Sequence, residues 1–334
     1  MLRSRSSWVQ IVCTPGSGNG RAARVAARIA RRLERRGRAA RIDCFQSAPD
    51  LSAWSATCAG GFSELLCVGG DATVSAAAPA AMRLGVPLLP VPMGFGNLFA
   101  DSFRLPAESR GALGVLGRGA VRDVDAGIVG GEVFLCHASY GLLADIEKAM
   151  ERGRARPRER WKRHLAYYAI ARDMLVDAPL PSIHVEVDGR LLIRDAVIAT
   201  VANVQTYRGF LNLTPEASAT DGWFDVAVME RGSRLQVWGR LLRMLLGGSL
   251  DRAGIHRCRG RRVRALVEGQ PPVLARMLPA ALPLIVPPAV AAAIPASPTA
   301  AALRRLAATR RDAPLRWPPV PAGSTPAAAL DAAG

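Results

Sequence analysis

The fold is decided by the stretch Leu65-Leu66-Cys67-Val68-Gly69-Gly70-Asp71-Ala72-Thr73. A short apolar run that ends in glycines and leads into a helical pattern predicts a buried strand that turns tightly into a helix. The two glycines let a ligand approach the backbone, Asp71 can hold a metal ion or a ribose hydroxyl, and Thr73 can donate to a phosphate oxygen. The same residues also fit a plain turn in which Asp71 and Thr73 cap the next helix.

The pattern occurs twice more in the first hundred residues. Apolar residues 8–13 precede Thr14-Pro15-Gly16-Ser17-Gly18-Asn19-Gly20, and residues 86–91 precede Pro92-Met93-Gly94-Phe95-Gly96-Asn97. Short strands that alternate with helices predict a parallel sheet, whose ligands gather at the carboxyl ends of the strands. We therefore expect the three glycine-rich loops to meet on one phosphate-rich ligand. The first loop, taken alone, matches neither the P-loop nor the dinucleotide spacing and fits a plain turn equally well.

The two halves of the chain have different patterns. In the first half, Ala22, Val25, Ile29 and Leu33 predict one apolar helix face with arginines opposite. The second half has strand-like runs at 133–135, 183–187, 196–202, 223–229 and 263–267, and helical patterns at 160–176 and 233–247. The basic segment 233–247 fits either a membrane-surface element or an ordinary packed helix.

The predicted fold class is therefore α/β, with a Rossmann-like nucleotide domain over residues 1–128. A second, β-rich and β-sandwich-like domain follows over residues 129–296, and its last part returns to the first domain. The Ala/Pro/Arg-rich residues 297–334 are predicted to form a flexible tail.

Charge and composition limit the class of partner. The 334 residues carry 44 Lys and Arg against 27 Asp and Glu, a net charge of +17, and only Lys148 and Lys162 are lysines. This charge predicts an anionic partner. Because no aromatic residues alternate with the basic ones, we expect an anionic membrane surface as the partner and no nucleic acid. The oligomeric state is left open.

Several features predict a cytoplasmic protein that works at the inner face of the membrane. The six cysteines lack metal-site spacing, which is typical of reduced thiols in the cytosol, and residues 1–13 lack the apolar core of a signal peptide. The apolar stretch 273–294 contains four prolines and Arg276, so we expect strands and turns there rather than a membrane helix.

The ordered motifs resemble the diacylglycerol kinase catalytic-domain family, which includes sphingosine kinases and bacterial lipid kinases. The family patterns Asn-Pro-x-Ser-Gly, Gly-Gly-Asp-Gly-Thr and Pro-x-Gly-Thr-x-Asn correspond to residues 14–18, 69–73 and 92–97. Residues 124–127, 134–145, 203, 209, 215–217 and 221–226 resemble further family motifs in the same order, so the resemblance covers about residues 8–290.

The resemblance implies transfer of a phosphate from ATP, with Mg²⁺, to diacylglycerol or a related lipid alcohol in a cleft between the two domains. The nucleotide-binding residues that it implies are Ser17, Gly18, Gly69, Gly70, Asp71, Thr73, Gly94, Gly96 and Asn97. It also implies Asp71, Asp125 and Asp221 as metal-linked acids, and Glu268 and Asp71 as catalytic groups.

The chain departs from the family at positions that carry the chemistry. The family's Asp-Gly-Glu, whose Asp would accept the proton of the lipid hydroxyl, is Glu268-Gly269-Gln270 here. One extra methylene can displace the oxygen by about 1 Å and slow the reaction about 10²-fold. Ala72, Phe95 and Leu98 replace a glycine, a threonine and an aspartate, and Pro79 interrupts the helix expected after the second loop.

Two alternatives to a lipid kinase therefore stay open. One is a catalytically degenerate lipid- or nucleotide-binding homologue. The other is an NAD-kinase-like enzyme, since that family also carries Gly-Gly-Asp-Gly-Thr.

Overall fold

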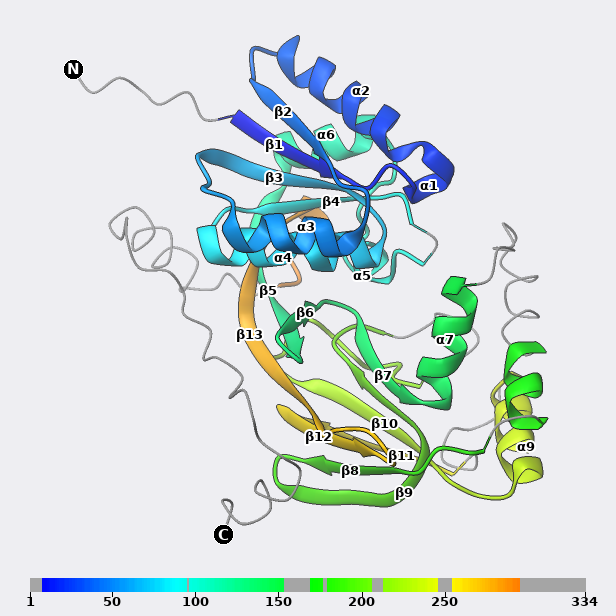
Figure 1. Cartoon of the computed structure of the whole chain (residues 1–334). Coiled ribbons are helices and arrows are strands. Elements are labelled where there is room, and N and C mark those ends of the chain that lie inside the picture. Colours follow the sequence, from blue (N-terminus) through cyan, green and yellow to red (C-terminus); the bar gives the residue numbers. More distant parts are fainter. Residues whose placement is uncertain are drawn as a thin grey trace.

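A computed structural model describes residues 8–94, 96–152, 169–176, 179–205, 213–245 and 254–294. Over these residues one sheet of thirteen strands passes through an α/β unit and a β-rich unit (Figure 1). The predicted class, an α/β domain followed by a β-sandwich-like domain, is confirmed. The domain boundaries after residues 128 and 296 stay a prediction.

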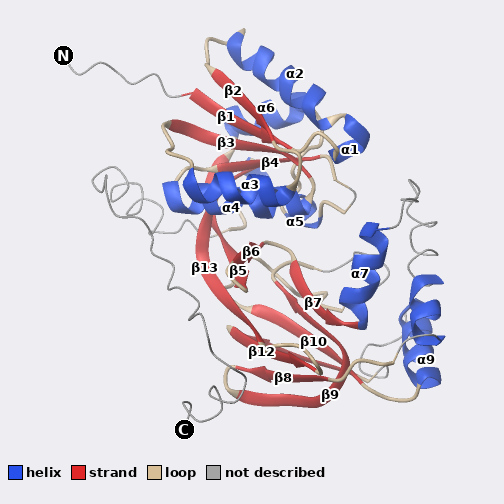
Figure 2. Ribbon diagram, in the orientation of Figure 1, coloured by secondary structure: helices blue, strands red, loops and turns tan. Residues whose placement is uncertain are grey.

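The α/β unit has four parallel strands in the spatial order β4-β3-β1-β2. They are β1 (Trp8–Cys13), β2 (Ala40–Cys44), β3 (Phe62–Gly69) and β4 (Leu88–Pro92). The helices described in this unit are α1 (Ser17–Gly20), α2 (Ala22–Glu34), α3 (Ala48–Thr57), α4 (Asp71–Leu84), α5 (Leu98–Ser102) and α6 (Ser109–Arg118). α2 lies beside α6, and α3 lies beside α4 across the sheet (Figure 2). β1, β3 and β4 are thus covered on both faces, which is why they read as continuous apolar runs.

Two long strands connect the units. β5 (Ala120–Val129) runs antiparallel to β13 (Val273–Val286), and Leu284 of β13 also pairs in parallel with Leu88 of β4. The strand that ends the β-rich unit therefore extends the sheet of the α/β unit. The pairing of β5 with β13 is interrupted between Leu278 and Leu282, where Ala280 has a φ of +48°.

The β-rich unit is an antiparallel arrangement covered by helices. Its further strands are β6 (Glu132–Phe134), β7 (His137–Gly141), β8 (Ile183–Val187), β9 (Arg190–Ala202), β10 (Phe224–Glu230), β11 (Ile255–Gly260) and β12 (Arg262–Val267). α7 (Leu142–Arg152), the helical segment 169–176 and α9 (Arg234–Leu245) share an apolar cluster with β9 and β10. A second cluster, which includes Val185, Val201 and Phe224, lies between the strands themselves. α10 (Pro288–Ala291) returns to β5.

The structure decides several expectations from the sequence. Residues 273–294 form β13 and α10, and within the described ranges no helix is both long and apolar enough to cross a membrane. α4 continues through Pro79 to Leu84, so the proline does not end it. α9 packs Val237 and Leu241 against the sheet, as an ordinary helix does. Phe95, residues 160–168 and the tail 297–334 lie outside the described residues.

Candidate functional site

The structure brings the three glycine-rich loops together at the carboxyl ends of β1, β3 and β4. The Thr14 hydroxyl lies 2.7 Å from the Ser17 hydroxyl and 2.9 Å from the Thr73 hydroxyl, which links the first loop to α4. The Met93 N–H donates to the Gly69 carbonyl at 2.8 Å, which links the second loop to the third. The loops therefore form one surface.

Glycine is required where the loop backbones touch. A Cβ built on Gly94 would lie 2.3 Å from the Gly70 Cα, and one built on Gly18 would lie 2.8 Å from the Met93 Cε. On Gly96 a Cβ would lie 3.2 Å from the Asp71 carboxylate. Side chains at these positions would push the loops apart, so the sequence keeps the backbone itself at the surface.

The first turn of α4 is suited to an anion. The helix begins at Asp71 after the N-cap Gly70, and no side chain caps it. N–H groups in a first helical turn have no partner within the helix, and with the helix dipole they attract phosphate. The Thr73 hydroxyl is committed to Thr14, and the Asn97 amide both donates to and accepts from the Gly94 backbone, at 2.9 and 2.8 Å. Thr73 and Asn97 therefore hold the loops in shape, and the backbone N–H groups are left for a ligand.

Asp71 is engaged by the protein on both carboxylate oxygens. Its Oδ2 accepts the Leu98 N–H at 3.0 Å and its Oδ1 accepts the Phe99 N–H at 3.1 Å, so Asp71 caps α5. The Cys136 thiol, which comes from the turn between β6 and β7, lies beside the same carboxylate. Burial raises the pKa of Cys136 well above its ordinary value, and the neighbouring Asp71 raises it further. Asp71 therefore ties α4, α5 and the β-rich unit together.

Asp125 lies at the junction of the two units and is 3% exposed. Its Oδ2 accepts the Gly222 N–H and its Oδ1 accepts the Ala280 N–H, each at 2.7 Å. Burial raises the pKa of Asp125, while these backbone donors act in the opposite direction and the nearby Asp221 raises the pKa further. Asp125 therefore organises the junction and has no oxygen left idle.

Asp221 is the most accessible of the three predicted metal-linked acids. Its side chain is 29% exposed, with Oδ2 3.6 Å from Arg259 Nη1 and Oδ1 accepting the Trp223 N–H at 3.1 Å. In the part of the chain that the structure describes, no three His, Cys, Asp or Glu side chains are grouped as metal ligands. The structure thus does not gather Asp71, Asp125 and Asp221 into one metal site, and backbone N–H groups occupy both carboxylate oxygens of Asp71 and of Asp125.

Glu268 is not brought to this region either. It is exposed in the turn after β12, where its N–H donates to the Ser182 carbonyl at 3.0 Å. The opposite end of β12 lies at the junction, since Arg261 donates to the Gly222 carbonyl at 3.2 Å. The strand between Arg261 and Glu268 spans roughly 20 Å at about 3.3 Å per residue. The fold therefore separates Glu268 from Asp71 and Asp125, and the predicted role of Glu268 lacks support from the geometry.

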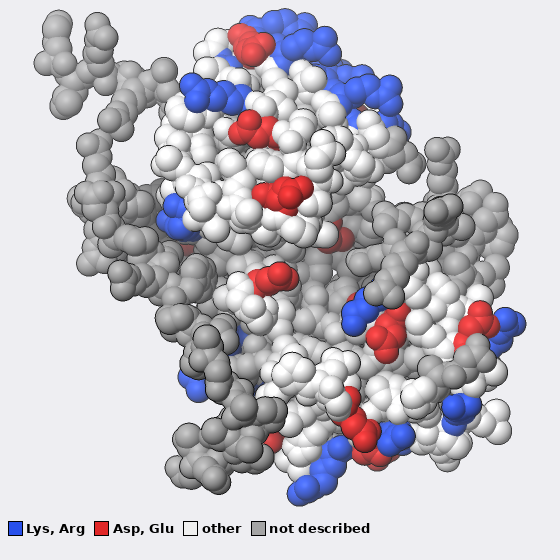
Figure 3. Space-filling view, viewed as in Figure 1, with Lys and Arg blue, Asp and Glu red and all other residues white. Residues whose placement is uncertain are grey.

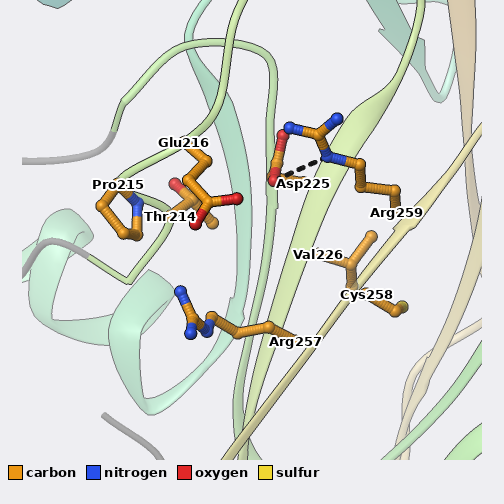
Figure 4. A pocket seen from close by; sticks show the side chains of 8 residues that line it. All are labelled: Thr214, Pro215, Glu216, Asp225, Val226, Arg257, Cys258 and Arg259. Atoms are coloured by element: carbon orange, nitrogen blue, oxygen red, sulfur yellow. Dashed lines mark hydrogen bonds and ion pairs between the residues drawn. The ribbon is translucent and has the colours of Figure 1, made fainter. Parts of the chain in front are cut away.

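A cavity of about 220 Å³ lies beside the junction, on β10 and β11 (Figure 4). It is lined by Thr214, Pro215, Glu216, Asp225, Val226, Arg257, Cys258 and Arg259. Arg259 Nε is 3.4 Å from Asp225 Oδ1, and the same guanidinium faces Asp221, so the cavity adjoins the junction. Burial raises the pKa of Asp225, and Arg259 lowers it. Asp225 Oδ2 is buried without a hydrogen-bond partner among the described residues, so this oxygen keeps an unused acceptor position.

The sequence did not point to this cavity. Asp225 and Arg259 meet because β10 and β11 pair in a register that places them opposite each other. Nothing local to either residue encodes that register. The available signal was the pair of family-like segments 215–217 and 221–226, which contain Pro215, Glu216 and Asp225 but did not assign them a role.

Comparisons with known proteins divide the chain into two parts that correspond to the α/β unit and the β-rich unit. Residues 9–129 match the diacylglycerol kinase catalytic domain, and residues 138–286 match the YegS C-terminal NAD kinase beta sandwich-like domain. A crystal structure of a diacylglycerol kinase from Bacillus anthracis (strain Sterne) superimposes with a TM-score of 0.62 at 18% identity, over 86% of this chain and 100% of that one. At this identity the likeness shows the fold alone.

Three curated relatives are similar over part of the chain. The uncharacterized protein sll0036 of Synechocystis is 28% identical over 180 residues, 53% of this chain and 40% of that protein. A diacylglycerol kinase of Bacillus subtilis is 28% identical over 222 residues, 61% of this chain and 70% of that protein. A diacylglycerol kinase of Staphylococcus aureus is 26% identical over 196 residues, 56% of this chain and 58% of that protein. The match thus spans less than two thirds of the first and third relatives.

Glycine loops on a Rossmann-like sheet, joined to a β-sandwich-like domain, are the arrangement that these two family models describe in sequence. Residues 9–129 thus match a diacylglycerol kinase catalytic domain, and residues 138–286 match a YegS-type C-terminal domain.

Proposed function

We propose that this protein is an ATP-dependent lipid kinase that transfers the γ-phosphate of ATP to the hydroxyl of diacylglycerol or a related lipid alcohol. The observation that carries the proposal is the uncapped N-terminus of α4 among three touching glycine loops. Such a cradle of backbone N–H groups suits the phosphates of a nucleotide. The family and the names of its bacterial members support a lipid acceptor.

In this proposal the loops position the phosphates and the side chains keep the loops in place. Ser17, Gly18, Gly69, Gly70, Gly94 and Gly96 supply the surface, while Thr73, Asn97 and Asp71 fix its shape through the bonds described above. Phosphoryl transfer depends on such positioning and on neutralising charge more than on covalent help from the protein.

Mg²⁺ bound with ATP would neutralise charge on the phosphates, and it commonly takes only one or two protein carboxylates. Asp221 fits this requirement because it is partly exposed at the junction, whereas Asp125 behind it uses both oxygens on backbone N–H groups. We assign Asp221 to the metal; Asp125 positions it through the neighbouring Gly222 N–H, whereas Asp71 holds α5.

For the acceptor we infer that its hydroxyl enters the cavity beside the junction and gives its proton to Asp225. Asp225 has a buried oxygen without a hydrogen-bond partner among the described residues, and burial raises its pKa, as a proton acceptor requires. Asp225 takes over the role that the resemblance implied for Glu268. The acceptor is a membrane lipid in this proposal, presented at the cytoplasmic face of an anionic bilayer.

A second candidate function, a lipid- or nucleotide-binding homologue without turnover, is favoured by two observations. The Asp71 carboxylate accepts two backbone N–H groups of α5 and lies beside Cys136, so its oxygens are already occupied. Glu268 lies at the end of β12 that is farther from the junction. This candidate predicts binding without transfer of phosphate.

One assay separates these functions. The full chain is incubated with γ-labelled ATP and Mg²⁺ in the presence of vesicles that contain diacylglycerol, monoacylglycerol or a sphingoid base, and separately with soluble NAD. Label in a lipid product supports the proposal, and label in NAD supports the NAD-kinase-like alternative. A thermal shift with Mg²⁺–ATP and no label anywhere supports the binding homologue, and the absence of both results contradicts nucleotide binding by the loops.

A further inference from the structure

α2 and its two cap residues carry a row of arginines on the outer side of the helix, here named the arginine ridge: Arg21, Arg24, Arg28, Arg31 and Arg35. At 100° per residue these five positions fall within about 80° of one another around the helix. The buried residues of α2, which include Ala26, Ile29 and Leu33, lie on the opposite side. The ridge is therefore the part of α2 farthest from the core, and all five arginines are exposed.

Folding does not explain this row. In the described part of the chain none of the five arginines is in an ion pair; Arg21 and Arg35 donate only to the Gly18 and Arg31 carbonyls, at 3.1 and 3.3 Å. Like charges one turn apart destabilise a helix, as do cations at its N-terminal end. Residues 21–41 hold nine arginines and one acid. Figure 3 shows this basic surface over α2, at the top of the molecule.

The shape and composition of the ridge favour a flat anionic surface over a nucleic acid as its partner. It is straight and convex, about 21 Å long at about 1.5 Å rise per residue, so it can lie along a flat surface. Residues 21–41 contain no aromatic side chain on which a nucleic-acid base could stack. A plane of lipid headgroup phosphates satisfies every arginine of such a row at once.

We propose that the arginine ridge of α2 is the surface that docks this protein on the anionic phospholipid headgroups of a bilayer. The inference deepens the proposed function and rests on it, because a lipid kinase must meet its acceptor in a membrane. The ridge begins where the first glycine loop ends, and Arg21 is bonded to the Gly18 carbonyl of that loop. Docking through the ridge therefore brings the glycine loops close to the membrane.

The test compares two variants of equal charge. In the ridge variant, the substitutions are Arg24→Gln, Arg28→Gln, Arg31→Gln and Arg35→Gln. The matched control changes four exposed arginines of the β-rich unit and of β13: Arg190→Gln, Arg194→Gln, Arg262→Gln and Arg276→Gln. Both lower the net charge by four. Gln is a good helix former, so α2 is expected to keep its helix, which circular dichroism checks.

Co-sedimentation with phosphatidylcholine vesicles, with and without phosphatidylglycerol, measures binding in the absence of nucleotide. Each basic residue at an anionic membrane strengthens binding about fivefold, so the ridge variant, which lacks four, is expected to bind about 600-fold more weakly and the control variant within about threefold of wild type. A third variant with lysine at the four ridge positions should retain binding. Wild-type binding should weaken as salt rises.

Three results would overturn the docking proposal. Equal loss in both glutamine variants would mean that only total charge matters, and no loss in the ridge variant would exclude the ridge. Binding of the wild type to duplex DNA or RNA that depends on the ridge, with vesicle binding unchanged in the ridge variant, would identify a nucleic-acid surface instead. Because no nucleotide is present, failure of the lipid kinase assay leaves this test unaffected.

Discussion

The Asp125 carboxylate accepts the Gly222 backbone N–H at 2.7 Å, although the two residues are 97 positions apart in the chain. The other oxygen of the carboxylate accepts the Ala280 N–H at the bulge of β13. One buried side chain thus holds β5, the turn before β10 and the strand that returns to the α/β unit. This arrangement fixes the positions of Asp125 and of Asp221, which precedes Gly222.

Replacing Asp125 by Asn is expected to lower the free energy of unfolding by about 2 kcal/mol. Asn has one carbonyl oxygen, so its NH₂ group would face one of the two backbone N–H donors and leave that donor buried and unsatisfied. Chemical denaturation at neutral pH measures the change. Asp145→Asn, at an exposed residue 3.8 Å from Lys148, is the control and should change stability by less than about 0.5 kcal/mol.

The effect of Asp125→Asn is also expected to depend on pH. Because burial raises the pKa of Asp125, the folded protein keeps this proton to a higher pH than the unfolded chain does. The contribution of Asp125 to stability therefore falls as the pH rises from about 4 through the raised pKa. The Asn variant has no such proton, so the advantage of the wild type should shrink across that window. A constant or growing advantage would contradict a raised pKa.

Gly94→Ala should separate the second and third loops. The new Cβ would lie 2.3 Å from the Gly70 Cα, and neither backbone can move without distorting the turn before α4 or α5. We expect a loss of about 2 kcal/mol and at least about tenfold weaker binding of ATP, measured by calorimetry. Gly16→Ala, in the first loop, is the matched control: nothing lies within 4 Å of its Cβ, and its φ is −67°. Equal effects of both substitutions would contradict the contact between the loops.

Asp225→Asn and Glu268→Gln distinguish the two positions for the proton acceptor. If Asp225 accepts the proton, Asp225→Asn should lower kcat by about 10²-fold or more with little change in the KM for ATP. Glu268→Gln should leave kcat within about threefold, because Glu268 lies at the far end of β12. The reverse ranking would restore the role that the family resemblance implied for Glu268.

The cysteines report on the fold through their reactivity. Cys44 is exposed, whereas Cys13 and Cys67 are fully buried and Cys136 is 7% exposed. Burial raises the pKa of Cys13 to about 12, and it also raises that of Cys67. Since the thiolate is the reactive form, iodoacetamide at neutral pH should label Cys44 and spare the other three until the chain is unfolded. Peptide mass spectrometry would show the order of labelling, and early labelling of Cys67 would contradict the buried β3.

Local signals in the sequence were sufficient for the α/β unit. Strands buried on both faces must be apolar along their whole length, and glycines are needed where loop backbones touch. For these two reasons β1, β3, β4 and their loops could be predicted from residues 8–97. The arginines opposite Ile29 and Leu33 marked the solvent side of α2 in the same way. Pro79 was misleading, because a proline within a helix removes one hydrogen bond but does not end a helix whose other residues are buried.

The sequence by itself determined which residues form strands, which turns need glycine, and which loops resemble those of the diacylglycerol kinase family, because these features depend on neighbours within a few positions. Only the tertiary structure decided which acids meet. Asp125 and Gly222, Asp225 and Arg259, and Asp71 and Cys136 come together through strand register and the return of β13, which are set by long-range pairing. The same long-range pairing places Glu268 at the far end of β12, away from Asp71 and Asp125. A carboxylate acquires its role from the donors that reach it, and those donors are distant in the sequence.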